Sequence, residues 1–202
     1  SRIDAGRIRL SLSMLDLEPV LEERVAWLQA ATGRVVELGP IGSSLPAVLA
    51  DVDAITTVID HLLDNAVKYS PEGSVVEVTA EPVGDEVLLR VSDAGIGMTA
   101  DQAEHCFERF WQADHGENRR FGGTGIGLYI VRSLVEAMQA TIAVRSHLGE
   151  GTTFELTLRT SVPEPERAEP VEAPAPGDGQ TSMIREYMRQ VGVPMQRAGE
   201  RR

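Results

Sequence analysis

Residues 51–69 read DVDAITTVIDHLLDNAVKY, the part of the chain that says most about its architecture. Apolar residues recur at the three- and four-residue intervals that gather side chains on one face of a helix. They are Ile55, Val58, Ile59, Leu62, Leu63 and Ala66. Asp51 is a suitable N-cap because its carboxylate can accept the first free backbone N–H groups. We therefore predict a long helix from Asp51 to about Tyr69, with one buried face.

The other face of this helix carries polar chemistry. His61 and Asn65 are four residues apart, so they share one side, opposite Leu62 and Leu63. An amide oxygen can ligate a hard cation, and Lys68 supplies a positive charge suited to phosphate one turn later. Taken alone, Asn65 is equally an ordinary solvated helix residue.

The remaining pattern is that of one α/β domain over residues 8–160. The predicted elements are strands near 8–14, 34–38 and 46–50, helices over 18–31 and 124–138, short helical pieces near 100–110, a hairpin over 74–82 and 86–92, and a hairpin over 141–146 and 152–159. Because helices and strands mix in this order, we expect an α+β fold.

Four further segments could carry chemistry. Asp93-Ala-Gly95-Ile-Gly97 follows a strand, and Gly123-Thr-Gly125-Ile-Gly127 leads into a helix whose N-terminus could bind phosphate. The latter is neither a P-loop nor a dinucleotide fingerprint. Residues 106–112 hold Phe107 and Phe110, which are three residues apart and are expected to pack a lid segment, and residues 149–154 form a turn entering a strand. Alone, these segments are also explained by ordinary turns and core packing.

In their order and spacing, the five segments resemble the N, G1, F, G2 and G3 boxes of the sensor histidine kinase ATP-binding domain, in the gyrase, Hsp90, histidine kinase and MutL superfamily. The resemblance covers residues 8–160. It implies a Bergerat-type fold: a two-layer α/β sandwich with a mixed sheet, about three helices on one face and a mobile ATP lid at 98–122. Residues 1–7 resemble the end of a dimerisation and phosphoacceptor helix.

The resemblance also implies roles for individual residues. Asn65 would bind Mg²⁺, Lys68 would lie near the phosphates, Tyr69 near the adenine or ribose, and Asp93 would accept the adenine amine. The other residues that it assigns to ATP are Gly95, Ile96, Gly97, Met98, Gly123, Thr124, Gly125, Ile126, Gly127, Leu128 and Thr153. Arg119 and Arg120 are expected to bring lid charge to the γ-phosphate.

Position 61 departs from the family, which usually has Asn there. One hypothesis gives His61 a pH-dependent contact near the γ-phosphate; the alternative makes it a passive hydrogen-bonding replacement. Cys106 stands where the family is usually aliphatic, and we interpret it as a small buried hydrophobe. None of the four histidines has the context of a phosphoacceptor, so we expect ATP binding without autophosphorylation by this chain alone.

The implied function is the ATP-binding part of a bacterial two-component sensor kinase, donating the γ-phosphoryl group to a histidine of a dimerisation domain. Expected partners are ATP, Mg²⁺, that domain and a response regulator, in the cytoplasm or in the cytoplasmic part of a membrane-bound sensor. The fragment is expected to be monomeric and the full protein a homodimer. The alternatives are an anti-sigma-factor-like serine kinase, a degenerate nucleotide-binding scaffold and a gyrase- or MutL-like ATPase. The last of these would be expected to have Glu at position 61.

Composition sets the remaining bounds. The 202 residues carry a formal charge of −12, which argues against nucleic-acid binding, and the single cysteine rules out an intramolecular disulfide. Residues 161–180 are rich in Pro, Glu and Ala and are predicted to be a disordered linker. Residues 181–202 form a basic tail, either frayed or able to form a short helix on a partner.

Overall fold

The computed structural model describes residues 10–39, 41, 45–112 and 124–161. The strands are β1 (Ser13–Leu15), β2 (Val36–Leu38), β3 (Val48–Ala50), β4 (Val76–Val83), β5 (Glu86–Asp93), β6 (Thr141–His147) and β7 (Gly151–Arg159). The helices are α1 (Leu17–Thr32), α2 (Val52–Tyr69), α3 (Ala100–His105) and α4 (Gly127–Ala137). The expected tail elements at 1–7 and beyond 161 lie outside the described residues.

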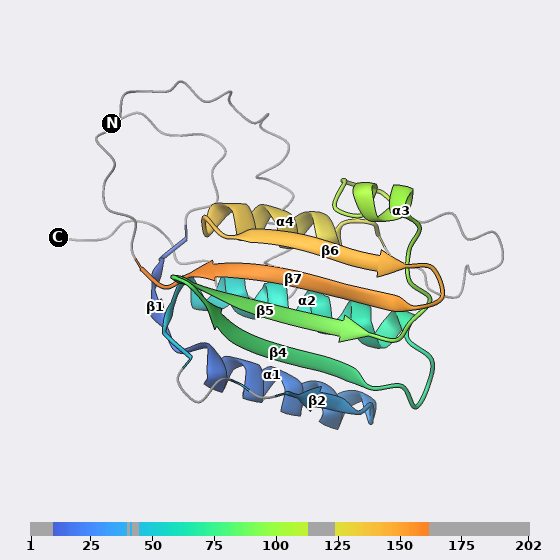
Figure 1. Ribbon diagram of the computed structural model, residues 1–202, viewed down its shortest axis with the longest axis horizontal. Coiled ribbons are helices and arrows are strands. Elements are labelled where there is room, and N and C mark those ends of the chain that lie inside the picture. The colour runs from blue at the N-terminus through green and yellow to red at the C-terminus, as the bar shows by residue number, and fades with distance from the viewer. Residues whose placement is uncertain (1–9, 40, 42–44, 113–123, 162–202) are drawn as a thin grey trace, which may run out of the picture. The chain divides into compact units, whose positions relative to one another are not determined.

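The main sheet has five strands in the order β2-β4-β5-β7-β6, and it is mixed, because β2 pairs parallel to β4 while the other pairs are antiparallel. Side chains alternate across it: Val87, Leu89 and Val91 of β5 are buried, and the residues between them are partly exposed. One face is therefore covered. In Figure 1, α2 and α4 lie behind this sheet, which confirms the predicted α+β sandwich.

Helix α2 is the central element of the helical layer. It packs between α1 and α4 and also contacts β4 and β5. Its predicted start is confirmed, because Asp51 caps the helix through the N–H groups of Asp53 and Ala54. Its predicted buried face is confirmed as well, with Ile55, Ile59 and the other apolar residues of that face at most 1% exposed.

Two predicted elements differ from the structure. The predicted strand at 8–14 is shorter, and β1 covers only Ser13–Leu15, paired antiparallel with β3 in a separate two-stranded sheet. The predicted helix at 124–138 begins later, at Gly127. Its glycine-rich start explains this delay, since Gly125 has a φ of 66°, which a right-handed helix does not accommodate.

Candidate nucleotide-binding site

The polar face of α2 holds three of the predicted site residues. His61, Asn65 and Lys68 lie on the second half of the helix, each partly exposed, beside the buried Leu62 and Ala66. The Lys68 ammonium lies 4.9 Å from the centroid of the Tyr69 ring, at the end of the same helix. The fold therefore brings an imidazole, an amide and an ammonium group to one side of a rigid element.

His61 faces the beginning of α4. A Cβ atom added to Gly127 would lie 3.5 Å from His61 Nδ1 and 3.8 Å from Cε1. Burial lowers the pKa of His61 below its usual 6.5, and the nearby charge of Asp60 only partly opposes this. Burial therefore favours the neutral form of the imidazole.

The N-cap residue of helix α4 has no polar side chain. Ile126 occupies the N-cap position and makes no side-chain hydrogen bond, so no side chain at that position accepts from the first N–H groups of α4. These groups and the positive end of the helix dipole suit an anion. The predicted residues Thr124, Gly125, Ile126 and Leu128 surround this point, and all four are at least partly exposed.

Asp93 lies at the end of β5 on the covered face of the sheet. Its Oδ1 accepts the N–H of Gly95 at 2.8 Å. Burial raises the pKa of Asp93, and the backbone groups of Gly95 and Thr152 and the Ser70 hydroxyl act in the opposite sense. A half-buried carboxylate held this way can still accept a hydrogen bond from an amine.

The glycines after Asp93 have a structural reason inside the protein. A Cβ on Gly95 would lie 2.4 Å from the carbonyl oxygen of Tyr69, and one on Gly97 would lie 1.9 Å from that of His147. Between them, the Ile96 N–H donates to the Tyr69 carbonyl at 3.1 Å. The next N–H, of Met98, donates to the Ser146 hydroxyl. Gly95 and Gly97 are therefore required by the close approach of the protein's own backbone, in addition to the expected role of making room for a base.

The strand register corrects the expectation for Thr153. It pairs with Ser92, and the two hydroxyl oxygens are 3.0 Å apart, on the face opposite to that of the Asp93 side chain. The residue opposite Asp93 is Thr152. Directly paired residues of antiparallel strands point to the same face, so Thr152 is the threonine beside Asp93.

The aromatic segment is only partly packed. Phe107 is buried and meets Phe154 edge to face, with ring centroids 6.1 Å apart. Ordinary core packing does not extend to Phe110, which is 58% exposed and has a φ of 63°. Its N–H donates instead to the Gly125 carbonyl at 2.9 Å. Cys106 is 4% exposed, and burial raises the pKa of its thiol to about 12, so it behaves as the predicted buried hydrophobe.

Arg119, Arg120 and Gly123 lie outside the described residues, as does the expected lid beyond residue 112. Two residues of the site were missed, Ser70 and Thr152. The signal for Thr152 was available, since the alternation along residues 151–159 puts it on the same face as the apolar Phe154 and Leu156. Nothing in the sequence around Ser70 indicated that it would lie beside Asp93.

Residues 50–162 match the family described as histidine kinase-, DNA gyrase B-, and HSP90-like ATPases. The chain belongs to this family, and its relatives mark it as an ATP-binding catalytic domain of the histidine kinase type. No helix in the described part of the chain has the length and hydropathy to cross a membrane.

Curated relatives are longer than the chain. The cell-division control histidine kinase PdhS of Brucella anthropi is 34% identical over 169 residues, which covers 78% of this chain and 16% of that protein. The sensor-like histidine kinase SenX3 of Mycobacterium bovis is 31% identical over 159 residues, 78% of this chain and 39% of SenX3. The chain thus spans less than half of each of these relatives.

Solved structures share the fold. Full-length ShkA, crystallised in complex with AMPPNP, superimposes with a TM-score of 0.66 at 29% identity, over 78% of this chain and 33% of ShkA. The mycobacterial sensor histidine kinase MprB superimposes with a TM-score of 0.62 at 22% identity, over 74% of this chain and 97% of the MprB chain. At that identity, MprB supports the fold alone.

Proposed function

We propose that this chain binds ATP with a divalent cation and donates the γ-phosphoryl group to a histidine of a dimerisation domain, from which a response regulator receives it. The observation that carries the proposal is the arrangement around α2. One end of its polar face meets the start of α4 at Gly127, and the other meets the Asp93 turn at Tyr69. Such a domain would work in the cytoplasm, where ATP is kept.

The two contact points suit the two ends of a nucleotide. His61 and Tyr69 are eight residues apart, so the points are separated by about 12 Å along the helix. Asp93, half-buried and acidic, provides a hydrogen-bond acceptor suited to an exocyclic amine. The N–H groups at the start of α4 and the Lys68 ammonium suit phosphates. These features support an adenine at the Asp93 end and the phosphates at the α4 end.

The residues present also fit a cation. Gly127 leaves the space next to His61 that a Cβ would fill, and Asn65 offers an amide oxygen on the same side of α2. Within the described residues no group of three His, Cys, Asp or Glu side chains could hold an ion by itself. A bound divalent cation would neutralise phosphate charge during transfer. The chain's own residues orient the nucleotide and hold its phosphates at the helix start.

The first test is calorimetric titration with ADP and with a non-hydrolysable ATP analogue, with and without Mg²⁺. We expect Asp93→Asn to weaken nucleotide affinity by roughly tenfold or more, because a charged acceptor is lost. Asp85→Asn, in the β4–β5 turn, is the matched control and should bind normally. Asn65→Ala should remove mainly the gain in affinity that Mg²⁺ brings.

Absence of nucleotide binding by the unmodified chain would contradict the proposal and favour the degenerate-scaffold alternative. A second experiment addresses the phosphoryl acceptor. With γ-labelled ATP, we expect no stable label on this chain alone and label on the dimerisation domain of a full-length histidine kinase relative when that domain is added. Label on a serine of an added protein would favour the serine kinase alternative instead.

A further inference from the structure

His61 stands between two helices that both contribute to the site. Its ring faces Gly127 at the first turn of α4. A Cβ atom added to Gly127 would lie 3.5 Å from His61 Nδ1 and 3.8 Å from Cε1. It lies on the same side of α2 as Asn65, one helical turn away. Two potential metal donors of different chemistry, an imidazole nitrogen and an amide oxygen, therefore flank the position proposed for the phosphates.

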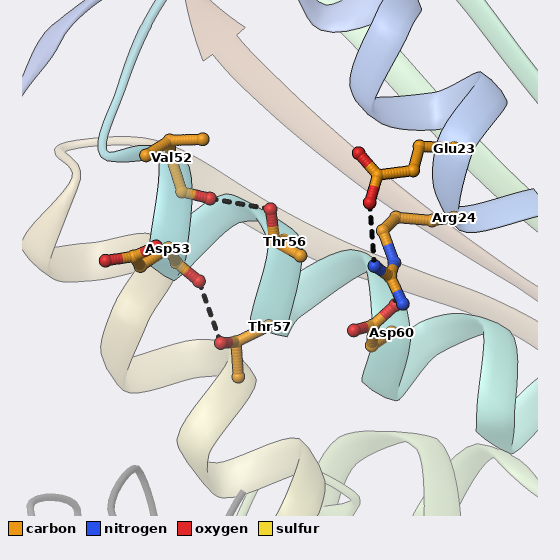
Figure 2. A network of polar contacts seen from close by, with 7 residues as sticks. All are labelled: Glu23, Arg24, Val52, Asp53, Thr56, Thr57 and Asp60. Carbon is orange, nitrogen blue, oxygen red and sulfur yellow. Dashed lines mark hydrogen bonds and ion pairs between the residues drawn. The ribbon is translucent and has the colours of Figure 1, made fainter. Parts of the chain in front are cut away.

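The acid next to His61 in the sequence is paired with a residue of α1. Asp60 is adjacent in sequence, but its Oδ1 accepts from Arg24 Nε of α1 at 2.8 Å, as an ion pair. Figure 2 shows Arg24 extending from α1 toward Asp60, with Glu23 on the far side of the guanidinium. The α1 side of α2 thus holds its own charge network, and His61 faces the other way, toward α4.

The two donors differ in the ions they prefer. Mg²⁺ strongly favours oxygen ligands in a near-ideal octahedron, whereas an imidazole nitrogen favours first-row transition ions. Affinity for such sites rises from Mn²⁺ to Co²⁺. A residue that changes an oxygen donor into a nitrogen donor therefore changes which ion accompanies the nucleotide.

We propose that His61 and Asn65 together ligate the divalent cation of the bound nucleotide, and that the imidazole makes this site prefer Co²⁺ and Mn²⁺ over Mg²⁺. The inference rests on the proposed function, because it concerns the same site. It gives His61 a specificity role, distinct both from a pH-dependent phosphate contact and from a passive replacement of Asn.

The test is titration of the full chain with ADP in the presence of Mg²⁺, Mn²⁺ or Co²⁺. We expect ADP affinity at least about tenfold higher with Mn²⁺ than with Mg²⁺, and higher again with Co²⁺. His61→Asn restores an oxygen donor and should bring the Mn²⁺ and Mg²⁺ values within about twofold of each other. His147→Asn, at an exposed position of β6, is the matched control and should keep the preference.

A spectroscopic readout identifies the ligand directly. Pulsed electron paramagnetic resonance of the Mn²⁺–ADP complex should show coupling to a histidine nitrogen in the unmodified chain and in His147→Asn, and none in His61→Asn. Circular dichroism checks that each variant is folded. If His61→Asn fails to fold, His61→Gln offers an alternative oxygen donor.

The outcomes separate the two claims. If ADP does not bind with any of the three ions, the proposed function itself fails. If ADP binds equally well with Mg²⁺ and Mn²⁺ and the spectrum shows no histidine nitrogen, the proposed function stands and the role of His61 as a ligand is overturned. A nitrogen coupling that persists in His61→Asn also overturns it.

Discussion

Two glycines near α2, Gly97 in the Asp93 turn and Gly127 at the start of α4, differ in what an added side chain would meet. At the Asp93 turn, an added Cβ on Gly97 would strike the His147 carbonyl oxygen at 1.9 Å. At the start of α4, an added Cβ on Gly127 would meet only the His61 ring, at an ordinary contact distance of 3.5 Å. Gly97 is enclosed by the protein's own backbone, and so is Gly125 just before α4, where an added Cβ would lie 2.8 Å from the backbone of Phe110 and Trp111. Gly127 differs from both, because it leaves space beside a polar side chain. The same residue type thus marks close packing in one place and room beside a polar side chain in the other.

The largest expected effect is that of Gly97→Ala. The new Cβ would overlap backbone at a φ of 63°, so we expect a loss of about 3 kcal/mol or more in the free energy of unfolding. Chemical denaturation followed by circular dichroism measures it.

Gly84→Ala is the matched control for that variant. Gly84 has a φ of 64°, but nothing lies within 4 Å of an added Cβ, so only the conformational cost of about 1 kcal/mol remains. Equal losses in the two variants would show that the contact with His147 contributes nothing.

A smaller effect distinguishes the two threonines of β7. Thr152→Val removes a hydroxyl that lies 2.9 Å from Ser146 Oγ beside Asp93, which we expect to cost about 1 kcal/mol of stability and to lower nucleotide affinity. Thr153→Val changes the opposite face and should leave affinity within about twofold, since it touches only the Ser92 pair. A larger affinity loss in Thr153→Val would contradict the assignment from the strand register.

Gly127→Ala should hardly change stability. Alanine is the better helix former, and its Cβ has room, so we expect a change of less than about 1 kcal/mol in the stabilising direction. Nucleotide affinity should nevertheless fall, because the methyl group fills the space between His61 and the helix start. Unchanged affinity in calorimetry would show that the space beside His61 does not contribute to nucleotide binding.

The smallest effect is a dependence of stability on pH. The folded-state pKa of His61 lies below the usual 6.5, so the unfolded chain takes up a proton first as pH falls. Stability from the neutral imidazole is present at pH 7.5 and decreases as pH falls through 6.5 toward the lower folded-state pKa. His61→Asn lacks this loss, and other titrating groups are common to both chains. A difference between them that stays constant from pH 7.5 to 5.5 would contradict the prediction.

The sequence was sufficient for elements with a strong local pattern. Helix α2 was predicted from its cap to its last residue, because Asp51 and the spacing of its apolar residues act locally. The hairpin at Gly84-Asp85 was predicted for the same reason. The strand β1 was overestimated, since its short length is set by pairing with β3, which is distant in sequence.

The sequence indicated the candidate residues of the site better than their arrangement in space. Asn65, Lys68 and Asp93 follow from short segments that resemble the family's boxes. The choice between Thr152 and Thr153 required the register of β5 against β7, and the exposure of Phe110 required its backbone angle. That His61 faces Gly127 depends on how α2 packs against α4, which no single segment encodes.

The backbone contact between Phe110 and Gly125 has a consequence for loop closure. The Phe110 N–H and the Gly125 carbonyl are joined at 2.9 Å, so a backbone hydrogen bond holds two positions together that are distant in the sequence. The entropy of closing a loop grows only slowly with length, by about 0.6 kcal/mol for each doubling. By this estimate, doubling the number of residues between Phe110 and Gly125 would raise the entropic cost of bringing these two positions together by only about 0.6 kcal/mol.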